Sequence, residues 1–426
     1  MGTRPRVLVL AEAANPELVS VPLVGWSLAT ALTGVADAHI VTQIRNRAAF
    51  LRAGLQEGRD FTATDTAAVA ERAWRLASRL RGSAGVGWTV NTAMQSLAYP
   101  YFERLVWRRF EAALRDGAYD LVHRVTPVSP TATSPIARRL QRIGVPFVLG
   151  PLNGGIPWPP GFEDIRTQER EWLSLVRGLY RYTPGRDRAL AATSLIFAGS
   201  RHTLSEIPAR HRPRAMWLPE NAIDPARFNR VAVQDGQGPL RACFVGRLVP
   251  YKGPDMLIEA AAPLLAAGRM RLDVIGEGPI RPALEAAVAA AGATDAVTFH
   301  GWLEHGAVQD VMAGTEVLAF PSVREFGGGV VLEAMALGVV PIVVDYGGPA
   351  ELLEPGTGYT VPLADRAGVI AGTRAALERA LAERAGLPAM AEAGRALVAA
   401  RYTWARKAEQ IRAAYDRLLA GQGIAA

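Results

Sequence analysis

The chain has 426 residues, of which 50% are hydrophobic and 20% are charged, and its formal net charge is +7. This length favours two or three domains and allows a sizeable buried core. No apolar run approaches the ~20 residues of a membrane span, and the short run at 6–11 lacks the features of a signal peptide, so we expect a cytoplasmic protein.

The first half of the chain alternates apolar runs with amphipathic stretches, a pattern typical of α/β folds. A loop rich in glycine and proline, GPLNGGIPWPPGF at 150–162, interrupts this alternation. Predicted strands lie at 6–10, 37–42, 120–125, 146–149, 195–198 and 215–218, and predicted helices lie at 25–33, 65–116, 135–142, 164–192 and from 200 onward.

The second half repeats the pattern after residues 231–239, VAVQDGQGP, which have the composition of a linker. Its single cysteine, Cys243, excludes an intramolecular disulfide, and we interpret it as a small buried side chain in an apolar strand. Two doubly wound Rossmann-like domains are therefore expected. The predicted strands lie at 240–246, 271–275, 296–299, 316–320 and 340–344, the domains at 1–230 and 240–404, and a last helix at 403–419.

The most informative segment is 321–351, PSVREFGGGVVLEAMALGVVPIVVDYGGPAE. It predicts a loop, a helix, a buried parallel strand and a Gly-Gly turn. Gly327, Gly328 and Gly329 let backbone N–H groups approach an anion closely, and the helix that opens there favours negative charge. Glu333 would lie about five residues into this helix, roughly 7–8 Å along its axis, which is about the distance between the phosphates and the ribose of a nucleotide.

Glu325 and Glu333, separated by seven residues and followed by Ala-Met-Ala and Gly338, resemble the signature of retaining nucleotide-sugar glycosyltransferases of GT-B fold, usually called glycosyltransferase family 4 or glycosyl transferases group 1. The resemblance implies two Rossmann-like domains facing across a cleft, with a C-terminal helix at about 405–426 crossing back to the first. It also implies that Glu325 faces the donor hexose and Glu333 the ribose. Further donor contacts would come from Phe326, the three glycines and Val330. The usual Gly-Phe-Gly is replaced here, so which amide meets which phosphate oxygen stays open.

Two cations follow the first strand of the second half, in FVGRLVPYKG at 244–253. Arg247 and Lys252 would lie at the carboxyl end of a strand, where doubly wound sheets bind ligands. There they can neutralise a diphosphate leaving group. The spacing resembles the family pattern Gly-Arg-x-x-x-x-Lys-Gly; a solvated surface pair is the alternative.

Two further donor contacts are expected at the same sheet edge. Gly276, in VIGEGPI, resembles a family loop near the nucleotide, although Gly-x-Gly alone also fits a plain turn. Trp302 follows the next strand and could add stacking surface against the base, or it could pack in the core.

In the first half, Gly25 resembles the glycine of a family loop that approaches the donor. His123 ends a strand and resembles a family histidine that touches the donor sugar; holding the loop is its alternative role. We expect no metal site, because the six histidines show no ligand spacing.

The loop 150–162 and the turn ENAID at 220–224 supply the remaining candidates. Asn153 and Trp158 could contact the acceptor or support the site, and the loop resembles an element of some polysaccharide-building members. Asn221 resembles the Asn of an Asn-Gly-x-Asp turn. A purely structural turn is the alternative for the loop.

The resemblance therefore implies a retaining glycosyltransferase without a cofactor, and the fixed cations lead us to expect that it needs no metal. It would move a hexose from a nucleotide diphosphate sugar to a hydroxyl of a saccharide, a lipid-linked glycan or a small molecule. The alternatives are a nucleotide-sugar epimerase and a catalytically silent binding protein of the same fold.

Charge is distributed unevenly along the chain. Residues 1–230 hold 30 Arg against 19 Asp and Glu, whereas the rest holds 17 Lys and Arg against 21 Asp and Glu. The asymmetry suggests that the first half meets a membrane surface, a phosphorylated lipid carrier or an acidic acceptor; an arginine-rich solvated surface is the alternative. Peripheral contact with the inner membrane face through the N-terminal domain is thus one expectation. No recognition motif for nucleic acid accompanies the charge, so no nucleic-acid partner is expected.

Overall fold

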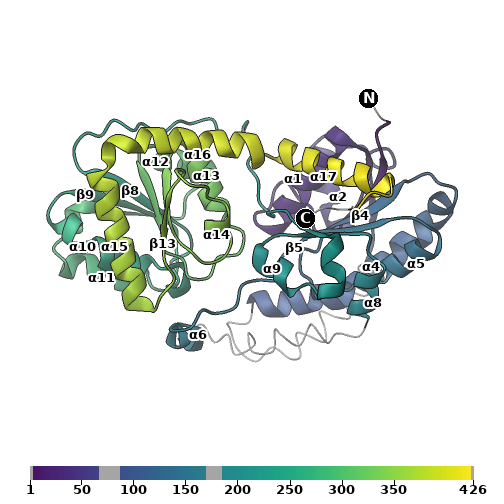
Figure 1. The fold of residues 1–426 in the computed structure, drawn as a ribbon, viewed down its shortest axis with the longest axis horizontal. Helices are drawn as coiled ribbons and strands as arrows, with labels where there is room; N and C mark the ends of the chain where they lie inside the picture. Colours follow the sequence, from purple (N-terminus) through teal and green to yellow (C-terminus); the bar gives the residue numbers. More distant parts are fainter. Residues whose placement is uncertain (1–2, 67–86, 169–184, 424–426) are drawn as a thin grey trace. The chain divides into compact units, whose positions relative to one another are not determined.

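The computed structural model describes residues 3–66, 87–168 and 185–423, and it divides the chain into two compact units (Figure 1). Unit 1 holds the described residues of Met1–Gly155, Leu173–Glu220 and Trp404–Ala426, and unit 2 those of Ile156–Trp172 and Asn221–Thr403. The domain limits expected from the sequence stay a prediction.

Unit 1 is built on a seven-stranded sheet in the order β3-β2-β1-β4-β5-β6-β7, and its strand pairs are parallel. Almost every residue of its central strands is buried, as expected for a parallel sheet covered on both faces, and β1 and β5 are largely apolar. The strands are β1 (Arg6–Ala11), β2 (Asp37–Gln43), β3 (Phe61–Thr64), β4 (Leu121–Thr126), β5 (Phe147–Leu152), β6 (Leu195–Ala198) and β7 (Ala215–Trp217).

The C-terminal helix α17 (Trp404–Leu419) is part of unit 1 and packs beside α1 (Val21–Val35), as Figure 1 shows. Its apolar face joins the unit's core through Ala408, Ile411 and Tyr415. The other helices are α2 (Arg47–Arg52), α4 (Gly87–Arg115), α5 (Ile136–Arg142), α8 (Arg186–Ala191) and α9 (Arg201–Glu206).

Unit 2 contains a six-stranded parallel sheet in the order β10-β9-β8-β11-β12-β13. Because β8 and β11 are neighbours, the loops that follow them meet at one edge of the sheet. The strands are β8 (Leu240–Val245), β9 (Met270–Ile275), β10 (Val297–Gly301), β11 (Val317–Phe320), β12 (Val340–Val344) and β13 (Tyr359–Val361). The helices are α6 (Glu163–Gln168), α10 (Pro254–Ala266), α11 (Arg281–Ala290), α12 (His305–Ala313), α13 (Gly329–Leu337), α14 (Gly348–Glu351), α15 (Arg366–Ala382) and α16 (Leu387–Arg401).

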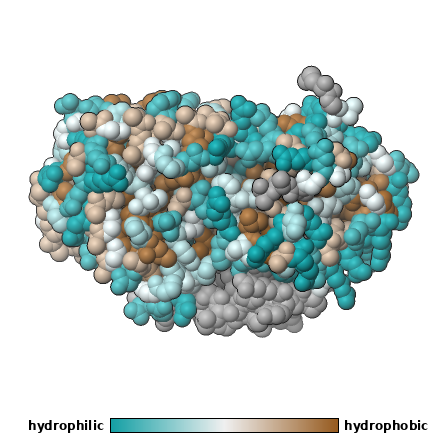
Figure 2. Space-filling view, in the orientation of Figure 1, coloured by the Kyte–Doolittle hydropathy of each residue, from teal (hydrophilic) through white to brown (hydrophobic). Residues whose placement is uncertain are grey.

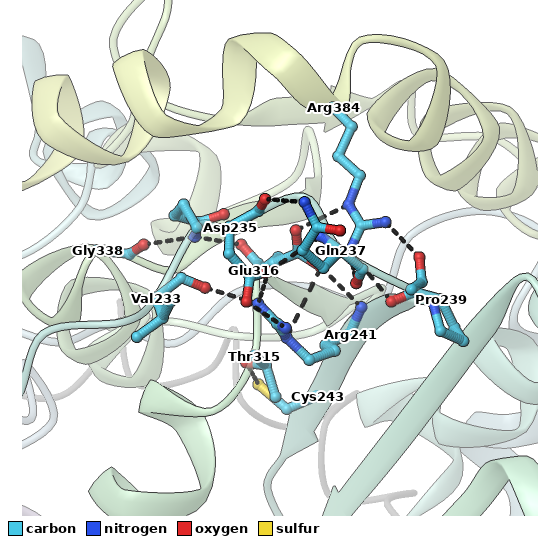
Figure 3. Close-up of polar contacts among 12 residues, drawn as sticks. Val233, Asp235, Gln237, Pro239, Arg241, Cys243, Thr315, Glu316, Gly338 and Arg384 are labelled. Carbon is cyan, nitrogen blue, oxygen red and sulfur yellow. Dashed lines mark hydrogen bonds and ion pairs between the residues drawn. The ribbon is translucent and has the colours of Figure 1, made fainter.

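Residues 231–239, expected to be a linker, are fixed onto unit 2 by a buried polar cluster (Figure 3). Glu316, which is 1% exposed, accepts two hydrogen bonds from the guanidinium of Arg384 at 2.9 and 2.6 Å. Arg384 also donates to the carbonyl oxygen of Gly238 at 2.6 Å, and Gln234 donates to that of Gly338 at 2.8 Å. The chain thus passes from unit 1 to unit 2 before this segment, between Glu220 and Asn221.

The expected α/β class with two doubly wound parallel sheets is confirmed, and the predicted strands are all present, with ends that agree to within three residues. The prediction omitted α2 and the short edge strands β3 and β13. Residues 67–86 of the predicted helix 65–116 and residues 169–184 of the predicted helix 164–192 lie outside the described residues. Among the helices that the structure describes, none is long and apolar enough to cross a membrane, and Figure 2 shows hydrophilic residues interspersed with small apolar areas on the visible face.

Candidate functional site

Lys252 and Glu325 form an ion pair where the loops after β8 and β11 meet in unit 2. Lys252 ends a short 3₁₀ turn, Pro250–Lys252, and Glu325 lies in the loop that leads to α13. The two side chains are only 18% and 19% exposed. A solvated surface pair, the alternative for this lysine, is therefore wrong.

Burial sets the electrostatics of this pair. Desolvation, with a smaller contribution from the cation of Arg247, lowers the pKa of Lys252 to about 8. Its ammonium also lies 5.3 Å from the ring centroid of Phe320. Arg247 itself is exposed, and its guanidinium has no hydrogen-bond or ion-pair partner among the described residues. The site thus combines a held cation with one that is free to bind an anion.

The glycine loop opens α13 as the sequence predicts. Gly328 is the N-cap residue, with φ 57°, a left-handed conformation that suits glycine. Gly327 is buried, whereas Gly329 and Val330 begin the helix in half-buried positions. The first turn of α13 therefore presents backbone N–H groups four residues after Glu325, the partner of Lys252, and this is a suitable environment for phosphate.

The second Gly-Gly turn, Gly347–Gly348, packs against the backbone of the loop that precedes α13. A Cβ atom on Gly348 would lie 1.7 Å from the carbonyl oxygen of Phe326, and one on Gly347 would lie 2.6 Å from that of Glu325. The amide of Gly348 also donates to the Glu325 carbonyl at 3.2 Å. Both glycines are needed for this close backbone approach.

Glu333 lies in the second turn of α13, where it is partly buried. Desolvation raises its pKa to about 7, and the charge of Arg227 opposes that increase. Arg227 also lowers the pKa of His305, after the larger effect of burial. The sequence reasoning missed Arg227, although it lies six residues after Asn221 in the same segment.

Asn221 and Trp158 lie in unit 2. The amide nitrogen of Asn221 is 3.4 Å from the position that a Cβ on Gly329 would occupy, so this side chain lies beside the start of α13. The ring of Trp158 lies 4.8 Å from the guanidinium carbon of Arg324 and 6.1 Å from the ring of Tyr251.

The sequence did not lead us to predict Arg324, Tyr251 or Tyr346 as neighbours of this segment. Arg324 precedes Glu325 and donates to the carbonyl oxygen of Ile156 at 3.3 Å, while Tyr346 donates to that of Pro157 at 2.9 Å. Their positions next to the motif residues are the only sequence signal that could have indicated them. The Pro-rich segment after Gly155 therefore contacts residues that flank Glu325 and the Gly347–Gly348 turn.

Gly276 and Trp302 have different surroundings. A Cβ on Gly276 would lie 1.9 Å from the carbonyl oxygen of Gly246, so close packing of the loops after β8 and β9 is sufficient to require this glycine. Trp302 is 70% exposed, and the core-packing alternative is wrong. Donor contact at both positions stays a prediction.

Three candidates lie in unit 1. A Cβ on Gly25 would be 2.2 Å from the carbonyl oxygen of Ala13, so α1 packs tightly against the loop after β1. Asn153 donates to the carboxylate of Glu220 at 2.9 Å and accepts from the amide of Gly155 at 2.9 Å. Both residues have structural partners, and their donor or acceptor contacts stay predictions.

His123 is fully buried. One ring nitrogen contacts the carbonyl oxygen of Gly150 at 2.7 Å, and the other contacts the hydroxyl of Tyr415 at 2.5 Å. Burial lowers its pKa to about 4, so the ring is neutral at pH 7. This geometry fits the loop-holding role, since a sugar contact would require one of these bonds to open.

Across the described residues, no three His, Cys, Asp or Glu side chains form a group that could hold a metal ion.

Residues 227–389 match the family model of glycosyl transferases group 1. The 2-deoxystreptamine glucosyltransferase of Streptomyces kanamyceticus is 29% identical over 357 residues, which cover 81% of this chain and 86% of that protein. The alpha-D-kanosaminyltransferase of the same organism is 34% identical over 183 residues, but the match spans 41% of this chain and less than half, 45%, of that relative.

Solved structures are similar over nearly the whole chain. HepE of Anabaena in complex with UDP has a TM-score of 0.62 at 15% identity, with 96% of this chain and 99% of that chain covered. Sucrose-phosphate synthase of Thermosynechococcus elongatus has a TM-score of 0.61 at 18% identity, with 98% and 100% covered. These likenesses show the fold alone, and the expected GT-B class is confirmed. Over residues 227–389, the chain is thus similar to the glycosyl transferases group 1 family.

Proposed function

We propose that the protein is a retaining glycosyltransferase that moves a hexose from a nucleotide diphosphate sugar to an acceptor hydroxyl without a divalent cation. The observation that carries this proposal is the ion pair of Lys252 and Glu325 beside the glycine-rich start of α13, within one unit. Two further groups are Arg247, in the loop after β8, and Glu333, within α13.

Departure of the diphosphate is the step that needs most electrostatic help. When the bond between the anomeric carbon and the phosphate oxygen breaks, negative charge grows on the diphosphate. Lys252 and Arg247 supply positive charge, and the N–H groups at Gly327–Gly329 supply oriented donors. Fixed groups of this kind stabilise the transition state without reorganisation.

The two glutamates would hold different parts of the donor. Glu325 would accept hydrogen bonds from sugar hydroxyls while Lys252 keeps its carboxylate oriented. Glu333 would accept from the ribose hydroxyls, and its pKa of about 7 means that binding draws it into the ionised form. A glycosidase-type pair, which needs carboxylates about 5 Å apart across one bond, is therefore not implied.

The acceptor oxygen would attack the anomeric carbon on the face from which the diphosphate leaves. The new carbon–oxygen bond forms as the old one breaks, and the proton of the acceptor hydroxyl passes to the departing phosphate oxygen. This sequence retains the configuration and needs no covalent enzyme intermediate.

Two of the similar proteins are named as enzymes that transfer sugars, and the structure of HepE contains UDP. Both facts support this chemistry. Thermal-shift screening of UDP-, GDP-, ADP- and TDP-sugars identifies the donor of this chain.

Transfer assays with Lys252→Ala and Glu325→Ala test the proposal. We expect each to lower kcat about 10²–10³-fold, the usual loss when one charge-stabilising group is removed. Arg271→Ala changes an exposed residue of unit 2 that is not a candidate site residue, so it serves as the control and should retain activity. Near-normal turnover in both site variants contradicts the assignment.

Product analysis tests the finer points. Proton NMR of the first product should show the anomeric configuration of the donor, and an inverted product excludes the retaining scheme. Turnover should also persist after treatment with a chelator, whereas restoration by added Mg²⁺ or Mn²⁺ would contradict metal independence.

A further inference from the structure

A pocket of about 260 Å³ opens in unit 1 beside α5 and α8. These two helices pack together, and the loop that follows β4 completes the wall. Among its described lining residues there is no Asp or Glu. Its polar and charged lining consists of Thr133, Ser134, Arg138, Arg139, Arg142 and Arg188.

Among the described residues, no carboxylate lines this arginine pocket to balance its positive charge. Arg138, Arg142 and Arg188 are exposed, and among the described residues their side chains have no hydrogen-bond or ion-pair partner. Arg139 lies over the ring of Trp107, with 5.5 Å between the guanidinium carbon and the ring centroid. Four like charges around one hollow repel each other, and an anion would relieve that repulsion.

The nearest acid along the chain does not neutralise the pocket. Asp187 precedes Arg188, but its carboxylate contacts the guanidinium of Arg210 and the ring of His211, the latter at 3.0 Å. Other arginines of the same unit do have carboxylate partners, for example Arg52 with Glu17 at 2.7 Å. The unpaired cluster is thus distinct from an ordinary arginine-rich surface.

The polar wall of the arginine pocket is fixed from inside. Arg124, which is 1% exposed, donates to the carbonyl oxygens of Ala132 at 2.7 Å and Ser129 at 3.0 Å, and to the hydroxyl of Ser134 at 2.7 Å. These bonds hold the loop that carries Thr133, which lines the hollow. A site with rigid walls loses less entropy when a ligand binds.

We propose that the arginine pocket binds a phosphate group, as a monoester or a diphosphate. Planar guanidinium groups bind phosphate oxygens in pairs, and the Thr133 hydroxyl adds a donor. A neutral sugar would leave the four charges uncompensated. Phosphate binding is independent of glycosyl transfer; that the phosphate belongs to the acceptor rests on the proposed function.

Calorimetric titration of the full chain with inorganic pyrophosphate tests the pocket. The pocket variant carries R138Q, R142Q and R188Q, all at exposed positions, so folding should be kept and thermal unfolding checks it. We expect its dissociation constant to rise at least about tenfold, because three charge-assisted contacts are lost. The single variant R188Q should show an intermediate loss.

A matched control removes the same charge elsewhere. R269Q, R271Q and R417Q replace three exposed arginines that also lack a described side-chain partner. Lys252→Met is introduced into all proteins, so that pyrophosphate binding at the donor site is weakened equally. An unchanged constant in the pocket variant, or an equal loss in the control, overturns the proposal.

Vesicle sedimentation separates the possible sources of the phosphate. Binding to vesicles of phosphatidylglycerol and phosphatidylcholine, but not of phosphatidylcholine alone, that is lost only in the pocket variant assigns a lipid headgroup. Pyrophosphate binding without vesicle binding assigns a soluble phosphate ester. Failure of the proposed function shows separately, as normal transfer by Lys252→Ala and Glu325→Ala, since neither residue lines the pocket.

Discussion

Burial makes the charge of Lys252 sensitive to pH. The chain has 47 Lys and Arg residues, and Lys252 and Lys407 are its two lysines. Both are largely buried, where a lysine can lose its proton near neutral pH more easily than an arginine can. The choice of lysine at these positions therefore makes their charge sensitive to pH.

We predict that kcat/KM for transfer falls as pH rises through about 8, the pKa of Lys252. The sign follows from the lowered pKa: the ammonium that stabilises the diphosphate is present below this pH and is lost above it. A pH–rate profile across the neutral and alkaline range measures the effect. In Lys252→Arg the cation persists, so the decline should move to higher pH; coincident profiles would contradict this role.

At the scale of elements, the donor-site loop depends on a turn that lies after the next strand. The Gly347–Gly348 turn follows β12 and packs against the backbone of Glu325 and Phe326. The position of Glu325 is thus determined by two adjacent loops of one sheet edge.

We predict that Gly348→Ala lowers the free energy of unfolding of unit 2 by about 1–3 kcal/mol, the usual cost of inserting a methyl group into a tightly packed site. Its Cβ would lie 1.7 Å from the Phe326 carbonyl oxygen, so the loop must move. Urea denaturation measures the change. The control is Gly306→Ala in α12, where nothing lies within 4 Å and stability should be unchanged or higher. Equal effects would refute the packing argument.

Some of these elements are easier to predict from the sequence than others. Buried strands such as β1 and β12 are continuous apolar runs, so their pattern is local and visible. The edge strands β3 and β13 have four and three residues, too few for a periodic signal. The spacing of Glu325 and Glu333 within one loop and helix is likewise local, and it predicted the start of α13. The support from Gly348 depends on a contact that no local pattern encodes.

At the scale of the whole molecule, contacts between segments that are far apart in the sequence are the hardest to predict. Trp158 belongs to unit 2 because Arg324 and Tyr346 contact its segment. These residues donate to the carbonyl oxygens of Ile156 and Pro157, which lie 168 and 189 residues earlier in the chain. Likewise, the unpaired arginines of the pocket gather only because α5 and α8 pack together. Charge counting indicated an anionic partner for the first half, but not a place for it.

A buried network of hydrogen bonds and charges joins three segments of unit 1. Each segment lies next to a point at which the described chain crosses from one unit to the other. Glu220, Asn153 and Lys407 each lie within three residues of such a point, and all belong to unit 1. The Lys407 ammonium donates to the carbonyl oxygen of Pro219 and interacts with the Glu220 carboxylate, which accepts from Asn153. Burial raises the pKa of Glu220 to about 7 and lowers that of Lys407 to about 7.

We predict that Lys407→Met lowers the free energy of unfolding by about 3–5 kcal/mol at neutral pH, because it leaves a buried carboxylate without its cation. Adding Glu220→Gln should recover much of that loss, so the double-mutant cycle is non-additive. In Lys407→Met, the folded-state pKa of Glu220 exceeds its unfolded value. The folded state then binds the extra proton, so stability is greatest at acidic pH and falls as pH rises through the folded-state pKa of Glu220. Without the lowering effect of Lys407, this pKa lies above the value of about 7 in the unsubstituted chain. Urea midpoints measured against the double variant, which lacks this group, isolate the effect; parallel pH dependences in the two variants would show that Glu220 does not carry the buried charge.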